Sequence, residues 1–140
     1  MIRVTRRYHF SASHRLALEH LSLAENLATF GKCANPYGHG HNYYVEVSAL
    51  GDVDEVTGRV VNPAQFDCFV QNEIVRTFDN KDLNHDVPDF ANLVPTTENL
   101  AYVIADRLKR KWPFQNIQLD GVRIQETKRN YFELRNAQAR

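Results

Sequence analysis

The sequence predicts an α+β fold in which helices cover one face of a sheet. Segments near both ends of the chain alternate between apolar and polar residues, which is typical of half-buried strands. Two central segments carry apolar residues at steps of three and four, the period of amphipathic helices. The strands are joined by connections that favour antiparallel pairing. The expected order is β-β-β-α-α-β-β.

The first strand is expected from about Ile2 to Ser11, because this stretch alternates and is rich in β-branched and aromatic residues. A long loop with one short helix follows. Ser22 and Glu25 have the spacing of a capping box, which predicts a helical turn over residues 22–29.

Residues 41–53 alternate again and predict a second strand. Thr57 and Gly58 then supply a turn, and Arg59–Val61 is expected to begin a return strand. Near the end of the chain, residues 117–127 and 130–134 predict a closing pair of strands, and the last residues, 135–140, are expected to fray.

Two longer helices are expected between these strands. Asn62 caps the first and Pro63 occupies its first turn. A polar loop over residues 79–90 separates it from the second helix, which Thr96 or Thr97 caps. The apolar stripe of the first helix consists of Phe66, Phe69, Val70, Ile74 and Phe78.

The composition fits one globular domain that spans residues 1–140. Seventeen Lys and Arg residues balance seventeen Asp and Glu residues, so net charge favours neither nucleic acid nor an anionic membrane. The two cysteines are too few for a disulfide framework. No apolar run approaches the length of a membrane span. We therefore expect a cytoplasmic protein without a nucleic-acid or membrane partner.

Two histidines in one short segment indicate a metal site. His39 and His41 are two residues apart, so on an extended backbone both side chains point to the same side. Gly38 and Gly40 allow a close approach of the backbone. Catalytic zinc usually has three protein ligands and one open position, and His14 is the natural third ligand. An ordinary pair of surface histidines is the alternative.

The two cysteines have different expected roles. Cys33 lies six residues before His39, where a thiolate beside a bound cation can accept a proton. We therefore interpret Cys33 as a proton-transfer group rather than a fourth metal ligand. Cys68 falls within the first long helix, where the expected role is that of a buried apolar side chain.

Two carboxylates are candidates for ligand binding. Glu126 ends a predicted strand and could accept two N–H bonds from a flat heterocycle. A surface ion pair with Lys128 is the alternative. Glu98 lies in the first turn of a predicted helix, where a carboxylate also stabilises the helix N-terminus.

Six segments resemble the 6-pyruvoyl-tetrahydropterin synthase family, which also includes the bacterial 6-carboxy-tetrahydropterin synthases of the queuosine pathway. The resemblance covers nearly the whole chain. The step from Cys33 to His39 resembles the pyruvoyl branch, because the carboxy branch typically has a shorter gap. The segments are FSASHRL, ENLATFGKCANPYGHGHNY, GDVDEVTGRVVN, LNHDVPDF, PTTENLA and QET.

The resemblance implies the tunnelling fold, which is a four-stranded antiparallel sheet with two helices on one face. It further implies that three subunits close a barrel and that two trimers stack into a homohexamer. The implied substrate is 7,8-dihydroneopterin triphosphate. Its triphosphate would be eliminated to give 6-pyruvoyl-tetrahydropterin, with zinc as Lewis acid. The protein would then be a carbon–oxygen lyase of tetrahydrobiopterin biosynthesis.

The resemblance also implies roles for single residues. His14, His39 and His41 match the zinc ligands, and Cys33 matches the catalytic cysteine. Glu126 matches the carboxylate that anchors the pterin ring. From the matching PTTENLA segment, we expect Thr96, Thr97 and Glu98 to lie beside the bound substrate.

The sequence departs from the family at one place. The family carries an Asp-His pair just before the L-N-x-D-V-P-x-F run, and this chain has Asp79 followed by Asn80. Asparagine does not titrate near neutral pH, so it cannot act as a general acid or base. Asp79 remains a candidate catalytic residue. Three alternatives stay open: weakened catalysis, replacement of the missing group by His85, or an altered reaction or pterin binding without turnover.

Overall fold

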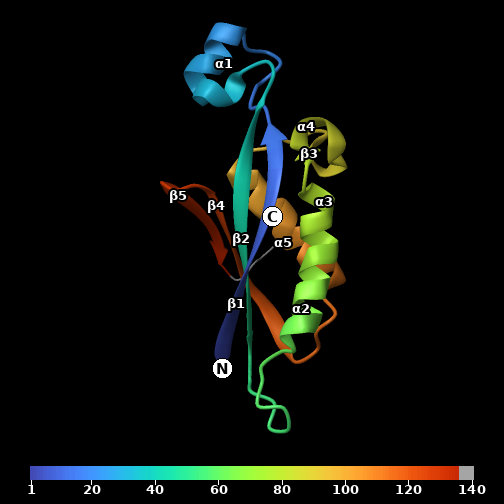
Figure 1. Cartoon of the computed structure of the whole chain (residues 1–140). Helices are drawn as coiled ribbons and strands as arrows, with labels where there is room; N and C mark the ends of the chain where they lie inside the picture. The colour runs from blue at the N-terminus through green and yellow to red at the C-terminus, as the bar shows by residue number, and fades with distance from the viewer. Residues whose placement is uncertain (136–140) are drawn as a thin grey trace.

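The computed structural model describes residues 1–135, and its five strands form one mixed sheet in the order β3-β1-β2-β4-β5 (Figure 1). The α+β class is confirmed. The expectation of a purely antiparallel, four-stranded sheet is wrong. A fifth, short strand, β3 (Lys81–Asp82), pairs parallel with β1. The long strands pair antiparallel and are β1 (Ile2–His14), β2 (His39–Gly51), β4 (Ile117–Thr127) and β5 (Asn130–Arg135).

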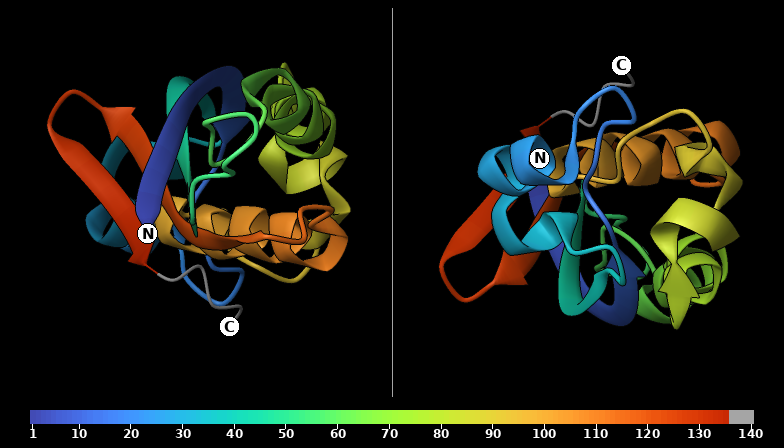
Figure 2. Two further views of the ribbon diagram at one scale, coloured as in Figure 1. Left: turned by 90° about the horizontal axis from the view of Figure 1, so that it is seen from below. Right: turned by 90° about the horizontal axis from the view of Figure 1, so that it is seen from above.

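Two long helical segments cover one face of this sheet (Figure 2). The first consists of α2 (Pro63–Val70), a π-helical turn η2 (Gln71–Val75) and α3 (Arg76–Phe78). The second is α5 (Thr97–Lys111). Burial of their apolar stripes against alternate strand residues supplies most of the folding free energy. Fully buried side chains of this core include Phe10, Tyr43, Val45, Phe66, Ile74, Leu100 and Ile104.

The first two strands are longer at one end than the sequence predicts. β1 continues to His14, and β2 begins at His39 rather than at residue 41. In the antiparallel register His14 lies opposite His39, and Ala12 lies opposite His41. All three histidines therefore lie at one end of the sheet, on two adjacent strands.

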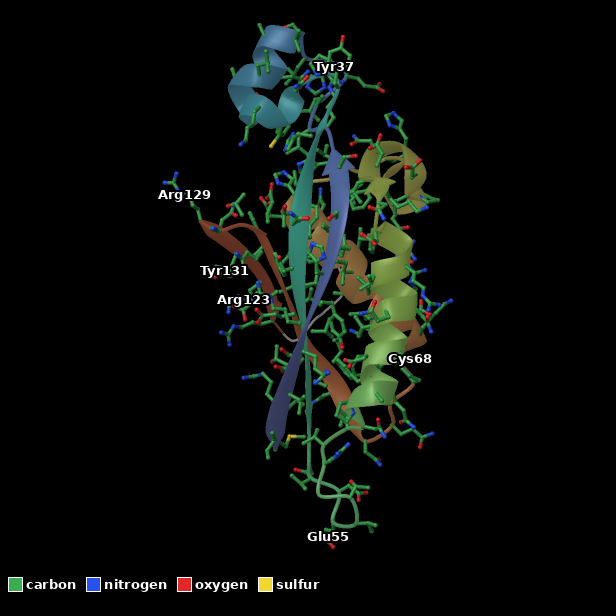
Figure 3. All side chains as sticks on the ribbon, in the orientation of Figure 1. Tyr37, Glu55, Cys68, Arg123, Arg129 and Tyr131 are labelled. Carbon is green, nitrogen blue, oxygen red and sulfur yellow. The ribbon has the colours of Figure 1, made fainter. Side chains whose placement is uncertain are left out.

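The predicted return strand over Arg59–Val61 is wrong. Residues 52–62 instead form a loop, which the Asp54 amide closes by donating to the Arg59 carbonyl at 2.9 Å. A return strand would need a free edge of β2, but β1 and β4 already pair with both edges. The tip of this loop, at Glu55, projects beyond the sheet (Figure 3).

Short helices make up most of the remaining chain. α1 (Leu23–Phe30) has the predicted capping box between Ser22 and Glu25. The 3₁₀ turn η1 (Gly31–Ala34) follows it and carries Cys33. The predicted polar loop over residues 79–90 is wrong in part, because it contains β3, α4 (Leu83–Asp86) and the 3₁₀ turn η3 (Pro88–Phe90).

The strand pair near the C-terminus is confirmed, with β4 and β5 joined by a tight turn at residues 128–129. The expectation of fraying covered residues 135–140. Arg135 ends β5, and residues 136–140 lie outside the described part of the chain. None of the helices within residues 1–135 is long and apolar enough to cross a membrane.

The expected burial of Cys68 is wrong, because this side chain is exposed on the outer side of α2 (Figure 3). The buried stripe of the helix runs through Phe66 and Val70. Cys68 lies two residues from each of them, about 200° around the helix axis, and therefore faces away from the sheet.

The other face of the sheet carries polar and aromatic side chains. The Arg7 guanidinium lies 4.4 Å from the ring centre of Tyr44, and that of Arg123 lies 4.0 Å from Tyr131. Arg123 and Tyr131 point away from the helices (Figure 3).

One polar cluster ties the helical layer to the sheet. The Arg6 guanidinium donates from Nε and Nη2 to the two carboxylate oxygens of Asp67, each at 2.7 Å. The Tyr8 hydroxyl donates to Asp67 as well, at 2.7 Å. The hydrogen bonds from Arg6 lower the pKa of Asp67 below its ordinary value of 3.8.

We expect Asp67→Asn to lower the free energy of unfolding at pH 7 by about 0.5–1 kcal/mol, because the ion pair is partly exposed. The folded-state pKa of Asp67 is lowered, so its contribution is present above the unfolded pKa and is lost as pH falls through the folded value. Thermal melts of both proteins from pH 7 to pH 3 should therefore converge at the acidic end.

Asp106→Asn is the matched control, because Asp106 forms an exposed pair with Arg110 within α5. This variant should melt close to the wild type at each pH. A difference between Asp67→Asn and wild type that does not shrink toward pH 3 would contradict the ionic origin of the effect.

Candidate active site

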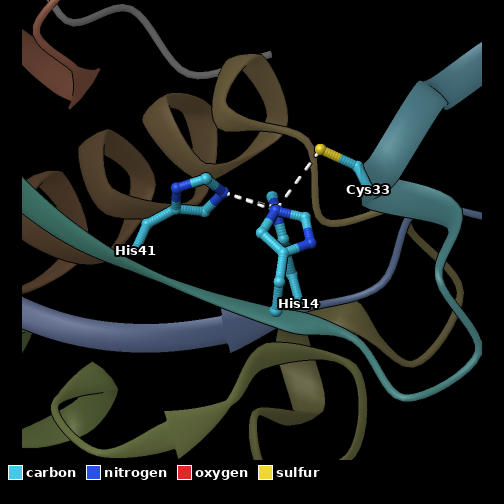
Figure 4. Close-up of side chains that lie close together, drawn as sticks. His14, Cys33 and His41 are labelled. Carbon is cyan, nitrogen blue, oxygen red and sulfur yellow. Dashed lines mark hydrogen bonds between the residues drawn. The ribbon is translucent and has the colours of Figure 1, made fainter.

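Three ring nitrogens converge at the end of the sheet where β1 stops and β2 begins. The Nε2 atoms of His39 and His41 lie 2.7 Å apart. The Nε2 atom of His14 lies 3.2 Å from that of His39 and 3.1 Å from that of His41. Figure 4 shows His14, His41 and the Cys33 thiol directed toward this common point.

The tautomer of His14 follows from its second ring nitrogen. His14 is buried, with 1% of its surface exposed, and its Nδ1 lies 2.8 Å from the Pro95 carbonyl oxygen. A carbonyl only accepts, so Nδ1 carries the proton and donates it. The Nε2 atom therefore presents a lone pair to the other two rings. Orientation of a ligating histidine by a backbone carbonyl is common at metal sites.

This geometry fits a metal ion. Nitrogen ligands at about 2.0–2.1 Å in a tetrahedral zinc site lie about 3.3 Å from one another. The three Nε2 separations of 2.7–3.2 Å are close to that value. The Cys33 Sγ atom belongs to the same group, since all four ligand atoms lie within 4.8 Å of one another. A group of three histidines and one cysteine that could hold a metal is therefore present.

Burial keeps two of the imidazoles neutral. Loss of hydration is the main cause that lowers the pKa of His39, and the nearby His14 and Lys32 act in the same direction. Burial also lowers the pKa of His41, to about 4, although the Glu126 carboxylate opposes it. Neutral imidazole is the form that binds a metal. The His39 Nδ1 atom is buried and has no hydrogen-bond partner among residues 1–135.

Cys33 is placed by η1, with its Sγ atom 3.4 Å from the Nε2 atom of His39. Burial raises the pKa of the thiol, the Glu126 carboxylate adds to this, and the charge of Lys32 opposes it. The Cys33 carbonyl accepts a hydrogen bond of 2.7 Å from the Leu16 amide. This bond joins η1 to the segment that follows His14.

Glu126 lies on the other side of the three rings. One carboxylate oxygen is 3.0 Å from the His41 Nε2 atom. The other accepts a hydrogen bond of 2.6 Å from the hydroxyl of Thr97, a residue that is 2% exposed. In the described chain Glu126 forms no ion pair with Lys128, the alternative that the sequence left open.

The start of α5 holds the other predicted substrate-binding residues. Thr96 is the N-cap, and its hydroxyl accepts from the Asn99 amide at 3.2 Å. The structure thus selects Thr96 from the two capping candidates. Glu98 lies in the first turn of the helix, and its side chain is exposed. Thr97 therefore contacts the Glu126 carboxylate, whereas Thr96 and Glu98 shape the helix end beside it.

Asp79 and His85 are not brought to Cys33 within this chain. One Asp79 carboxylate oxygen accepts from the Ser11 amide at 3.0 Å, at the outer edge of β1. His85 is exposed, and Asp82, 2.7 Å from its Nδ1 atom, raises its pKa. Within residues 1–135 neither Asp79 nor His85 has a hydrogen bond or ion pair to Cys33 or to the three histidines. Both stay predictions.

Asn80 borders an open hollow at the ends of β1 and β2 that His41 and Lys81 also border. Its backbone has φ 58°, and its amide donates to the Ser11 carbonyl at 2.7 Å.

The predictions from sequence did not identify two groups that contact the site, the Tyr43 side chain and the Pro95 carbonyl. The Tyr43 hydroxyl lies 3.4 Å from the His14 Nδ1 atom, and its ring packs edge-on against His41. The strand alternation from His41 to Tyr43 places both on one face and could have indicated this contact. The carbonyl of Pro95 comes from a distant loop, and no pattern identifies a backbone acceptor of this kind.

The fold and the site define a class of protein: an α+β chain with a group of three histidines and one cysteine that could hold a metal at the end of its sheet. A 6-pyruvoyl tetrahydropterin synthase structure from Caenorhabditis elegans superimposes with a TM-score of 0.88 at 38% identity, over 96% of this chain and 95% of that one. The 6-pyruvoyltetrahydropterin synthase structure from Plasmodium vivax, at 16% identity and a TM-score of 0.65, covers 97% of this chain and 99% of that one and shares the fold.

Sequence comparison then identifies the family. The model of the 6-pyruvoyl tetrahydropterin synthase family matches residues 3–137. The human 6-pyruvoyl tetrahydrobiopterin synthase is 47% identical over 127 residues, which cover 91% of this chain and 86% of that protein. The protein of that name from Pongo abelii is 50% identical over 110 residues, 79% of this chain and 76% of that one. The chain belongs to the 6-pyruvoyl tetrahydropterin synthase family, as its motifs predict.

We expect His39→Ala to remove bound metal, because two imidazoles then remain where three converge. Protein reconstituted with Zn²⁺ and desalted should carry about one ion per chain for wild type, a stoichiometry typical of such sites, and far less for the variant. Elemental analysis measures the difference. His20→Ala, which changes an exposed histidine outside the group, should retain the wild-type content. Equal metal content in the wild type and His39→Ala would contradict the site.

Proposed function

We propose that this protein converts 7,8-dihydroneopterin triphosphate to 6-pyruvoyl-tetrahydropterin with release of triphosphate. It would then be a zinc-dependent carbon–oxygen lyase of tetrahydrobiopterin biosynthesis. One observation carries the proposal: the Cys33 thiol, three ring nitrogens and the Glu126 carboxylate lie around one point. A metal-binding group, a proton-transfer group and an acceptor for a heterocycle are the parts that this reaction needs.

Glu126 would anchor the pterin ring. A carboxylate can accept two parallel hydrogen bonds from the N–H groups along one edge of a flat heterocycle. The Thr97 hydroxyl fixes the carboxylate by donating to one of its oxygens. Thr96 and Glu98 would border the same end of the ring, because they form the first turn of α5 with Thr97.

His14, His39 and His41 would hold the zinc ion. When bound, zinc supplies a Lewis acid that acidifies the hydroxyl and C–H groups of the substrate side chain and favours the thiolate of Cys33. The Pro95 carbonyl keeps His14 in the tautomer that leaves Nε2 free. Burial keeps the pKa values of His39 and His41 low, so protons compete weakly for their lone pairs.

Cys33 would move protons during the reaction. Its Sγ atom lies close to the ring nitrogens, where the substrate side chain would sit next to the ligated position. A thiolate at this place can remove a proton from a carbon beside a developing carbonyl and return it to the neighbouring carbon. Elimination of triphosphate and internal redox rearrangement then give the pyruvoyl side chain.

The pyruvoyl product is favoured over the carboxy product by similarity. A protein from Archaeoglobus fulgidus provisionally named a 6-carboxy-5,6,7,8-tetrahydropterin synthase is 32% identical over 114 residues, 81% of this chain and 88% of that protein. The relatives named 6-pyruvoyl tetrahydrobiopterin synthase reach 47% and 50%. The spacing from Cys33 to His39 favours the same branch. A 6-carboxy-tetrahydropterin synthase of the queuosine pathway is the alternative.

We further propose that the protein is a cytoplasmic homohexamer in which three sheets close a barrel and two trimers stack. The free edges of β5 and of the first half of β1 support this, because unpaired strand edges favour association between copies. The described chain alone does not bring Asp79 to Cys33, which leaves room for a contribution of Asp79 or His85 across a subunit interface.

Purified protein with Zn²⁺ should release triphosphate from 7,8-dihydroneopterin triphosphate and form the pyruvoyl product, which chromatography distinguishes from the carboxy product. Cys33→Ala should lower kcat by about 10²- to 10⁴-fold, because it removes a proton-transfer group. Cys68→Ala is the matched control, because Cys68 is exposed on α2. No turnover above background at full zinc occupancy would overturn the proposed lyase activity.

A second candidate function is pterin binding with little or no turnover, and the observation in its favour is Asn80. The family histidine at this position is replaced by a side chain that cannot titrate near neutral pH. This candidate requires the Glu126 contact but not the chemistry of Cys33. Calorimetry with a pterin should show binding that Glu126→Ala weakens.

Asn80→His distinguishes the two candidates. If the site is a synthase that lacks one proton-transfer group, the substitution should raise kcat by about 10²-fold or more. Histidine tolerates the backbone conformation of Asn80, because both residues are enriched at positive φ. The steady-state rate of triphosphate release measures the effect. An unchanged rate in a variant that still binds zinc would count against a damaged synthase.

A further inference from the structure

The segment between His14 and α1 has almost no regular structure, yet it joins a predicted metal ligand to the helix that precedes Cys33. Side-chain amides hold its backbone. Asn26, which is 4% exposed, accepts from the Leu18 amide at 2.8 Å and donates to the Leu18 and Leu21 carbonyls at 3.2 and 3.3 Å. The far end of the segment is thereby fixed to α1.

Asn84 holds the near end. Its Oδ1 atom accepts a hydrogen bond of 2.7 Å from the Arg15 amide, and its Nδ2 atom donates to the Arg15 carbonyl at 2.9 Å. One side chain thus satisfies both backbone groups of Arg15, as a neighbouring strand would. Since β1 ends at His14, Asn84 continues the pairing by one residue beyond the strand.

Both candidate catalytic elements depend on this attachment. Arg15 is bonded directly to His14, so its backbone fixes the direction in which the chain leaves the metal ligand. The next residue, Leu16, donates its amide to the Cys33 carbonyl at 2.7 Å. The path from Asn84 through Arg15 and Leu16 therefore reaches both His14 and Cys33.

Asn84 is itself held in place from the other side of β1. It lies in α4, whose N-cap residue Asp82 accepts from the Asn84 amide at 3.1 Å. Asp82 belongs to β3, which pairs with Ala12 and Ser13 of β1. The side-chain amide of Asn84 therefore reaches Arg15 from a short segment that is attached, through β3, to the same strand that carries His14.

We propose that Asn84 is a positioning residue for the metal centre, which it orders by fixing the backbone of Arg15 and, through Leu16, that of Cys33. It contacts neither the ring nitrogens nor the thiol and acts through its neighbours. The proposal rests on the metal site of the proposed function. Partners that orient metal ligands typically contribute about 10- to 100-fold in metal affinity or activity.

The test is Co²⁺ binding to the full-length, metal-free protein, because Co²⁺ occupies zinc sites and its visible absorption reports ligand geometry. Asn84→Leu keeps the volume of the side chain and removes both hydrogen bonds. We expect Co²⁺ affinity to fall about 10- to 100-fold and the absorption bands to shift or weaken. Asn84→Asp keeps an acceptor for the Arg15 amide and loses the donor, so we expect an intermediate loss of about 2- to 10-fold.

Asn92→Leu is the matched control, because Asn92 is an exposed asparagine bordering the same groove beside Arg15. It should bind Co²⁺ like the wild type. Melting of the metal-free proteins separates positioning from general stability: a purely structural role would lower the melting temperature and leave the affinity and spectrum of the folded protein unchanged. That result would overturn the proposal.

If Asn84→Leu does not fold, Asn84→Asp decides, and wild-type affinity and spectrum in that variant would likewise overturn the proposal. The outcome is independent of the reaction assignment. A wild-type protein that binds Co²⁺ tightly but does not turn over the pterin triphosphate refutes the lyase activity and leaves the role of Asn84 intact. Failure of the wild type to bind Co²⁺ would refute both.

Discussion

The pairing of β1 with β2 is the constraint on which the site depends. With His14 opposite His39 and Ala12 opposite His41, three imidazoles lie on two adjacent strands at one end of the sheet. If the register of either strand slipped by one residue, the histidines of that strand would point to the opposite face of the sheet, because strand side chains alternate. The same register buries Phe10 and Tyr43 under the helices, so the energy of core packing fixes the position of the ligands.

The fold holds three ring nitrogens close together. His14 carries its proton on Nδ1, so its Nε2 atom presents a lone pair to the other two Nε2 atoms, and the three atoms lie 2.7–3.2 Å from one another. The close approach of the chain also constrains residue 38. Gly38 has φ 71°, and a Cβ atom there would lie 3.1 Å from the His14 carbonyl oxygen. The sheet register and this loop together hold the three rings close to one another.

Sequence patterns predict the parts of this structure that have a period or a known motif. The strands, the capping box of α1 and the helix from Pro63 to Phe78 follow from alternation, capping and apolar stripes. The convergence of His39 and His41 follows from their spacing on a strand. His14 could be named as the third candidate from the need for three ligands, and the family resemblance supported it, but the sequence gives no distance between residues 25 positions apart.

The wrong predictions have a common physical cause: each depends on contacts with distant parts of the chain, which local sequence patterns do not show. Arg59–Val61 reads as a strand, but both edges of β2 are taken by β1 and β4. Cys68 lies in a helix with a long apolar stripe, but its position turns it to solvent. The roles of the Pro95 carbonyl and the Asn84 amide depend on tertiary contacts between distant segments, and asparagine in a polar loop is common enough to carry no signal.

The replacement at Asn80 is a change of chemistry rather than of structure. The residue adopts a left-handed backbone conformation, which asparagine tolerates better than most residues, and its amide is bound to the Ser11 carbonyl. Its neighbour Asp79 accepts a hydrogen bond from the Ser11 amide, so both backbone groups of Ser11 at the edge of β1 are paired. Histidine is also among the residues enriched at positive φ, so this backbone is compatible with the family residue. At this position the chain therefore differs from the family pattern in whether the side chain can titrate near neutral pH.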